Sequence, residues 1–95
     1  MQVDITARHF TPSKKLKNMV HEKIKKIEKF NSKLMNISIV LTKEVNYEGV
    51  EIIAKGKGYI AVAHEKKENF EKAFISAIEK ITIQIKKQHD RIVAH

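Results

Sequence analysis

The chain has 95 residues, no cysteine, and a formal net charge of +8 from 19 Lys and Arg against 11 Asp and Glu. The length suits one domain, residues 1–95, and the absence of thiols excludes a disulfide framework and favours a cytoplasmic protein. The acidic start argues against a signal peptide, the short apolar runs argue against a membrane span, and the basic excess favours a polyanionic partner such as RNA, DNA or anionic lipid.

Alternating and helical apolar spacings define the first two predicted elements. Residues 2–7 alternate between apolar and polar side chains, which predicts a strand. A helix is predicted from near Ser13 to near Asn31, capped by Ser13 or by Thr11 with Pro12 in its first turn. Its apolar positions recur at spacings of three and four, typical of one buried stripe: Leu16, Met19, Val20, Ile24, Ile27 and Phe30.

Three further strands are predicted in the middle of the chain. Residues 37–42 and 50–54 each alternate, and the turn-prone segment 46–49 separates them, so we expect an antiparallel pair. The glycines of Lys55–Gly58 predict a tight hairpin with two lysines at its tip. A fourth strand then follows over residues 59–63.

A second amphipathic helix is predicted from about Glu68 to roughly Ile92, again from apolar residues at helical spacing. The resulting order is β-α-β-β-β-α. Because each helix has one apolar stripe to bury, we predict an α+β fold in which a four-stranded sheet carries both helices on one face.

The positive charge is concentrated in the predicted helices. Residues 13–33 carry eight lysines against two glutamates, and residues 66–92 carry seven bases against four acids, so these segments have net charges of +6 and +3. The remainder is close to neutral at −1. Solvated surface lysines are the ordinary explanation of such residues, but the asymmetry favours helices that face structured RNA through phosphate and ribose contacts. An anionic membrane surface is the competing class of partner, yet the sheet needs the apolar stripes for its core.

No motif indicates catalysis, a cofactor or a metal. The segment His21–Lys25 begins like the zinc motif H-E-x-x-H but ends in lysine, which removes the second imidazole. Gly56–Gly58 lacks the third glycine of a dinucleotide site, and no serine has the context of an activated nucleophile. We therefore expect a binding protein without cofactor or metal rather than an enzyme.

Three segments resemble the ribosome hibernation-promoting factors. Residues 20–30, VHEKIKKIEKF, resemble the family signature V-x-x-K-h-x-K-L-E-x-Y/F, where h is apolar. Residues 5–9, ITARH, resemble I-T-G-R-H, and residues 80–87, KITIQIKK, resemble K-L-x-R-Q-L-x-K. The resemblance covers essentially the whole chain and agrees with the predicted order of elements.

The resemblance implies a fold like a double-stranded RNA-binding domain and a monomer that binds the small ribosomal subunit and the intact ribosome. The implied site lies on ribosomal RNA in the messenger and transfer RNA channel, where occupancy blocks translation and preserves idle ribosomes. The basic positions of the motifs are Arg8, Lys23, Lys26, Lys80 and Lys87. Charge adds Lys86 and Arg91, and we expect these seven residues to contact phosphate or ribose.

The chain departs from the family pattern at four positions. Ile83 replaces an arginine, Glu71 and Ile75 replace the tyrosine and aspartate of Y-x-A-I-D, and Ala7 replaces a glycine. The length resembles the short form of the family, for which pairing of two ribosomes would require a second hibernation factor. The alternative function is a general structured-RNA binder or RNA chaperone.

Overall fold

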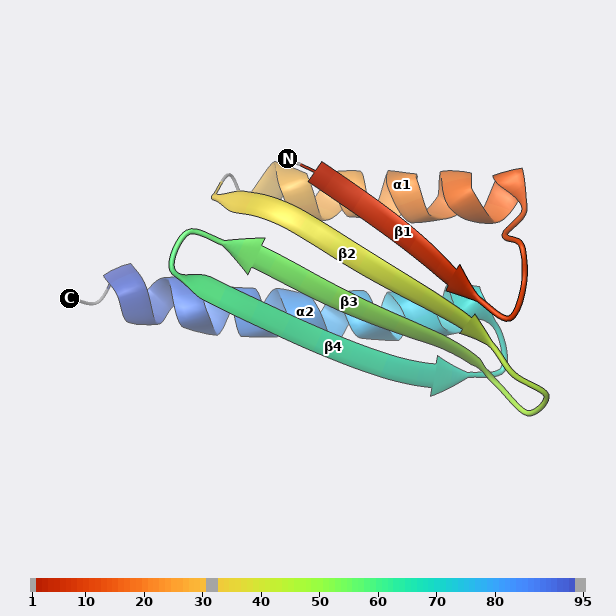
Figure 1. Ribbon diagram of the computed structural model, residues 1–95. Helices are drawn as coiled ribbons and strands as arrows, with labels where there is room; N and C mark the ends of the chain where they lie inside the picture. The colour runs from red at the N-terminus through yellow and green to blue at the C-terminus, as the bar shows by residue number, and fades with distance from the viewer. Residues whose placement is uncertain (1, 31–32, 94–95) are drawn as a thin grey trace.

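The computed structural model describes residues 2–30 and 33–93, and their order of elements is the predicted one (Figure 1). The elements are β1 (Gln2–Arg8), α1 (Lys14–Phe30), β2 (Leu34–Lys43), β3 (Glu48–Gly56), β4 (Tyr59–Lys67) and α2 (Phe70–Val93). The predicted end of the first helix near Asn31 lies outside the described residues. The predicted β-α-β-β-β-α fold with a four-stranded sheet is confirmed.

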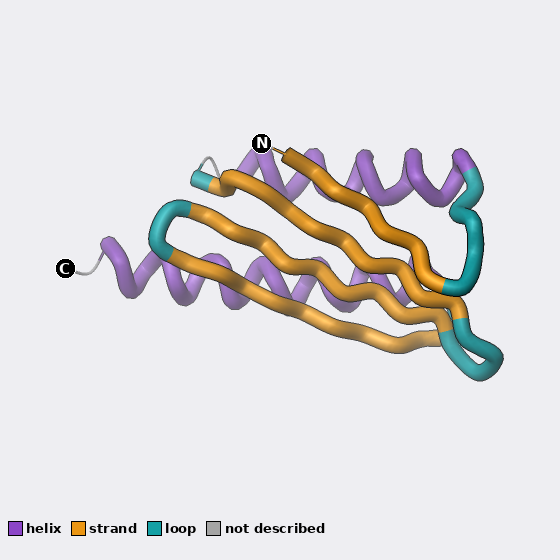
Figure 2. Tube along the Cα trace, viewed as in Figure 1, coloured by secondary structure: helices purple, strands orange, loops and turns teal. Residues whose placement is uncertain are grey.

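The sheet has the strand order β1-β2-β3-β4, so every strand lies beside its neighbour in the sequence (Figure 2). β1 and β2 are parallel because α1 returns the chain to the other end of the sheet between them. The expected antiparallel pairing of β2 with β3 is confirmed, and β4 joins β3 through the predicted hairpin. Gly58 adopts a φ of 84° in this turn, a conformation that glycine reaches without steric cost.

Both helices cover the same face of the sheet and run in the same direction, as Figure 1 shows. The alternation predicted for the strands holds, since the inward positions of β2, β3 and β4 are fully or nearly fully buried. The largest fully buried side chains come from both helices and from the two inner strands, β2 and β3: Phe74, Ile24, Ile37, Ile39, Leu41, Ile52, Ile81, Ile85, Val20 and Val50. The core is therefore one layer between sheet and helices.

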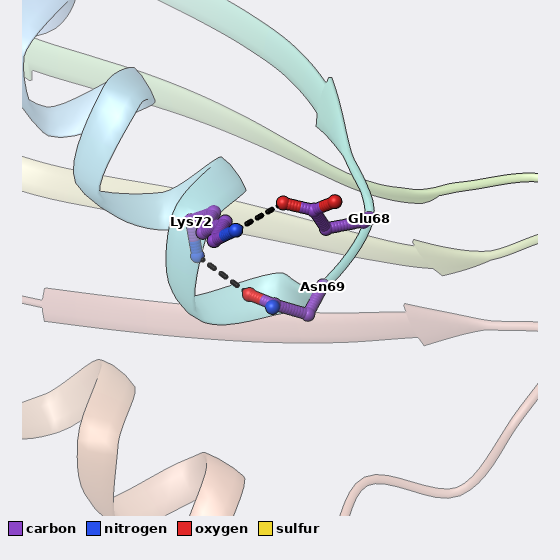
Figure 3. A network of polar contacts seen from close by, with 3 residues as sticks. All are labelled: Glu68, Asn69 and Lys72. Carbon is purple, nitrogen blue, oxygen red and sulfur yellow. Dashed lines mark hydrogen bonds and ion pairs between the residues drawn. The ribbon is translucent and has the colours of Figure 1, made fainter.

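Side-chain caps fix where both helices begin. The Ser13 hydroxyl accepts a 3.0 Å hydrogen bond from the Leu16 amide, so Ser13 is the cap of α1. In α2 the Asn69 side chain accepts a 2.9 Å bond from the amide of Lys72, whose ammonium pairs with Glu68 (Figure 3). Glu48 accepts a further 2.9 Å bond from the Phe70 amide. Because Glu48 begins β3, this bond ties the start of α2 to the sheet.

Candidate nucleic-acid interface

Five of the seven predicted RNA-binding residues lie on the two helices with described side chains. Lys26, Lys80, Lys86 and Lys87 are exposed, and Lys23 is half-buried beside the apolar stripe of α1. The two helices that carry these lysines share one face of the sheet and run parallel (Figure 1). Arg91 also belongs to α2, but its side chain lies outside the described part of the structure.

Arg8 is not brought together with the helix lysines. It ends β1, where Val3, Ile5 and Ala7 point toward the helices and the alternate positions point away from them. Arg8 is exposed and pairs in register with Thr42 of β2, on the open face of the sheet. A flat RNA surface that contacts the outward side of both helices would therefore not reach Arg8.

Lys80 is held in place by a contact between α2 and β4. Its ammonium lies 2.6 Å from a carboxylate oxygen of Glu65, which also accepts a 2.8 Å hydrogen bond from the Ser76 hydroxyl. The hydrogen bond from Lys80, followed by that from Ser76, lowers the pKa of the Glu65 carboxyl. The side chain of Lys80 remains 58% exposed and that of Glu65 only 13%. Lys80 can thus reach a phosphate, although part of its charge is already balanced.

One end of the molecule is strongly depleted of acids. No Asp or Glu occurs in residues 29–43, 52–64 or 80–89, and these segments meet where β2 begins, β3 turns into β4 and α2 approaches its end (Figure 2). The hairpin lysines Lys55 and Lys57 lie here and are exposed. The Lys57 amide donates a 3.4 Å hydrogen bond to the carbonyl of Lys33, which connects the turn to the start of β2.

Lys33, Lys55 and Lys57 were not among the residues predicted to bind RNA. The hairpin was predicted and its lysines were noted, but no family motif covers it. The three acid-free stretches of sequence were a usable signal, because the predicted pairing of residues 37–42 with residues 50–54 places the first two of them side by side. The basic surface thus extends from the helices onto the hairpin end.

Three of the four departures from the family pattern fall on the surface of α2, and the fourth, Ala7, is half-buried in β1. Ile83 is 56% exposed and Ile75 is 40% exposed, so both lie off the buried stripe of α2. Glu71 is exposed as well. An apolar side chain therefore stands where the family motif has an arginine, which removes one cation from the outer side of this helix.

The histidines do not gather into a ligand set in the described residues, where no group of three or more His, Cys, Asp or Glu is positioned to hold a metal. The Nδ1 atom of His9 lies 2.7 Å from a carboxylate oxygen of Glu44, and His9 has a φ of 70°. No described helix is both long and apolar enough to cross a membrane. The apolar stripes of α1 and α2 are buried against the sheet and are not available to enter a lipid surface.

Comparison with known proteins supports the resemblance seen in the motifs. The family model for sigma 54 modulation proteins and S30EA ribosomal proteins matches residues 3–93. A ribosome hibernation promoting factor of Pseudomonas putida is 26% identical over 91 residues, which cover 96% of this chain and 89% of that protein.

Two solved structures have the same fold. A ribosomal subunit interface protein from Coxiella burnetii superposes with a TM-score of 0.87 at 19% identity, over 94% of this chain and 98% of the other. The N-terminal domain of Protein Y from Thermus thermophilus superposes with a TM-score of 0.82 at 16% identity, over 92% and 98% of the two chains. These likenesses establish the arrangement of sheet and helices.

Proposed function

Because the chain belongs to the sigma 54 modulation protein and S30EA ribosomal protein family, we propose that it is a ribosome hibernation factor. In this proposal it binds small-subunit ribosomal RNA in the channel of messenger and transfer RNA. Occupying the channel blocks translation and preserves idle ribosomes. The role is one of binding, without catalysis, and it places the protein in the cytoplasm with its ribosomes.

The observation that carries the proposal is the pair of parallel basic helices on one face of a rigid sheet. Lys26, Lys86 and Lys87 are exposed on these helices, and Lys80 is oriented by Glu65. Since their helices are packed on a common core, the backbone positions that carry these lysines are fixed before RNA arrives. Structured RNA is recognised by shape, phosphate and 2′-hydroxyl contacts, which such an array can supply without reading base edges.

The competing function is that of a general structured-RNA binder. The same lysine array would attract any folded RNA, because phosphate contacts carry no sequence information. Specific binding to the ribosome then requires that the shape of the whole basic surface fit one channel. Competition between ribosomes and excess duplex RNA separates the two functions.

The test is sedimentation of the purified protein with salt-washed bacterial ribosomes and with separated subunits at physiological salt. We expect stoichiometric binding to small subunits and intact ribosomes that resists excess duplex RNA. Ribosomes loaded with messenger and initiator transfer RNA should exclude the protein, because both would occupy one channel. If added duplex RNA displaces the protein from ribosomes, the general RNA-binding function is favoured. If the protein binds loaded and empty ribosomes equally well, it does not occupy the channel of messenger and transfer RNA.

The proposal assigns silencing of single ribosomes to this chain. Pairing of two ribosomes would be supplied by a second hibernation factor. Sucrose-gradient profiles of ribosomes with the purified protein alone test this division. Single ribosomes should remain single, and paired ribosomes formed by this protein alone would show that it performs both steps.

A further inference from the structure

A hollow of about 610 Å³ lies at the acid-depleted end of the molecule, beside the β3–β4 hairpin. Apolar side chains form much of its wall, chiefly Met35, Tyr59 and Ile60. Lys55 and the two glycines of the hairpin complete one side, and Gln88 of α2 borders the other. The hollow is open to solvent and is not part of the outer helix surface described above.

The exposed apolar surface of this hollow is built into the sheet. The register of β2 and β3 shifts so that Leu34 and Asn36 oppose consecutive residues of β3, which leaves Met35 without a partner. Met35 is consequently 62% exposed. Ile60 lies on the edge strand β4 and is 58% exposed. The Gln88 side chain donates a 2.7 Å hydrogen bond to the Ile60 carbonyl, which fixes this wall against α2.

One lysine lines this hollow, and others belong to the chain segments next to it. Lys55 lines the hollow and Lys57 follows it in the turn, with Lys33 connected to that turn through a backbone hydrogen bond. The contact between Gln88 and Ile60 also shows that this stretch of α2, which carries Lys86 and Lys87, runs alongside the start of β4. Lys55 in the wall, together with the lysines of these neighbouring segments, makes the surroundings of the hollow cationic.

An apolar floor with cationic surroundings matches a nucleotide, whose base is flat and weakly hydrated at its faces and whose phosphates are anionic. Single-stranded RNA segments are bound in this way, with unstacked bases on aromatic or apolar side chains and lysines on the backbone. The neighbouring lysines of α2 favour RNA over an acidic peptide, since one polyanion can contact both them and the hollow.

We propose that the hollow takes one unstacked base of a bound RNA, while Lys55 and Lys57 contact its flanking phosphates. The inference rests on the proposed function and adds to it a third RNA-binding element, the β3–β4 hairpin, beside the two helices.

The test compares a short RNA duplex that has one bulged 2-aminopurine nucleotide with the same duplex fully paired. We expect the wild-type protein to bind the bulged RNA more tightly and to change the fluorescence of the bulged base. Ile60→Thr and Met35→Gln should each weaken binding to the bulged RNA by about tenfold, the factor that corresponds to about 1.4 kcal/mol. Their binding to the paired duplex should not change.

Val62→Thr is the matched control, because Val62 lies two residues from Ile60 on the same strand, is 45% exposed and does not line the hollow. It should bind both RNAs like the wild type. Urea unfolding of each variant shows whether the fold is retained.

The inference is overturned if the wild type does not prefer the bulged RNA, or if both hollow variants bind it unchanged. Weaker ribosome binding by these variants with unchanged RNA binding would mean that the hollow takes a protein segment instead. Sedimentation of the wild-type protein with ribosomes tests the proposed function separately. The protein can bind ribosomes in that experiment even if the hollow binds no base.

Discussion

The side-chain amide of Gln84 pairs with the backbone of Val62 as a neighbouring strand would. The Val62 amide donates a 3.0 Å hydrogen bond to Oε1 of Gln84, and Nε2 of Gln84 donates a 2.6 Å bond to the Val62 carbonyl. Since β4 is the last strand of the sheet, its outer edge would otherwise present unpaired backbone groups to other chains. Gln84, with Gln88 one turn later, covers part of this edge.

Replacing Gln84 with leucine should destabilise the protein by about 1–3 kcal/mol, because two hydrogen bonds are lost and each contributes about 0.5–1.5 kcal/mol. Urea unfolding measures this change. Gln88→Leu loses the single bond to Ile60 and should cost about half as much. The uncovered edge of the Gln84 variant should also promote self-association, which analytical ultracentrifugation would detect. Equal stability of the two variants would contradict this role of Gln84.

Stability should fall at acidic pH partly through Glu65. Its pKa in the folded protein is lowered by the hydrogen bonds from Lys80 and Ser76, so the folded state favours the carboxylate. The stabilisation is present above the ordinary pKa of glutamate and is lost as pH falls through the lowered folded-state pKa. Glu65→Gln should therefore lose less stability than the wild type as pH is lowered below the ordinary glutamate range.

Thermal unfolding across this acid range provides the measurement. Glu68→Gln is a second test of the same kind, since a hydrogen bond from Lys72 lowers the pKa of the Glu68 carboxyl in the same direction, and it too should lose less stability in acid. Combining the two substitutions should flatten the acid dependence further. An acid profile of Glu65→Gln identical to that of the wild type would show that the contact with Lys80 is not maintained in solution.

The helix lysines should determine how ribosome binding depends on salt. Each phosphate contact contributes a slope of roughly 0.7–0.9 in log affinity against log salt concentration. Replacing Lys23, Lys26 or Lys87 with glutamine should therefore lower the slope by about one unit each and leave folding intact. Lys80→Gln should lower it less, because Glu65 already balances part of that charge.

Lys67→Gln is the matched control for these variants. Lys67 is exposed but ends β4, away from the acid-depleted end of the molecule. It should leave the slope nearly unchanged. Unchanged ribosome affinity in the four helix variants would rule out the assigned site.

Substitution of Arg8 distinguishes two ways in which the protein could bind RNA. If the outer surface of the helices makes the contact, Arg8→Gln should reduce ribosome affinity much less than Lys87→Gln, because Arg8 belongs to the open face of the sheet. Binding titrations at two salt concentrations compare these variants. Equal losses would mean that ribosomal RNA contacts both faces and that the resemblance of residues 5–9 to the family motif reflects a direct contact.

The sequence was sufficient for the order of elements, because apolar alternation and helical spacing specify which side of each element is buried. The cap at Ser13 and the hairpin at Gly58 follow from local chemistry and were predicted as well. The alternation of residues 2–7 already placed Arg8 opposite the helices, although the motif grouped it with them.

Other features of the site depend on contacts between distant elements. Gln84 is part of a family motif rich in basic residues, yet its bond partner is 22 residues away and becomes a neighbour only when α2 lies along β4. The pairing of Lys80 with Glu65 has the same origin. The hollow depends on a one-residue shift between β2 and β3 at Met35, which apolar patterning does not reveal.

Gly56 should tolerate no larger residue, because Tyr59 packs directly over it. A Cβ atom on Gly56 would collide with the Tyr59 ring, which is 8% exposed and whose burial raises its pKa. Gly56→Ala should thus destabilise the protein by about 1–3 kcal/mol, as overpacking of buried side chains does.

Gly49→Ala is the matched control in the same strand, since its Cβ would meet the Tyr47 ring at an ordinary 3.4 Å. Urea unfolding should show a clearly smaller loss for Gly49→Ala, and equal losses would mean that both reflect the general effect of alanine at a glycine in β3. Since Tyr59 lines the hollow, Gly56→Ala should also weaken binding to bulged RNA more than binding to paired RNA.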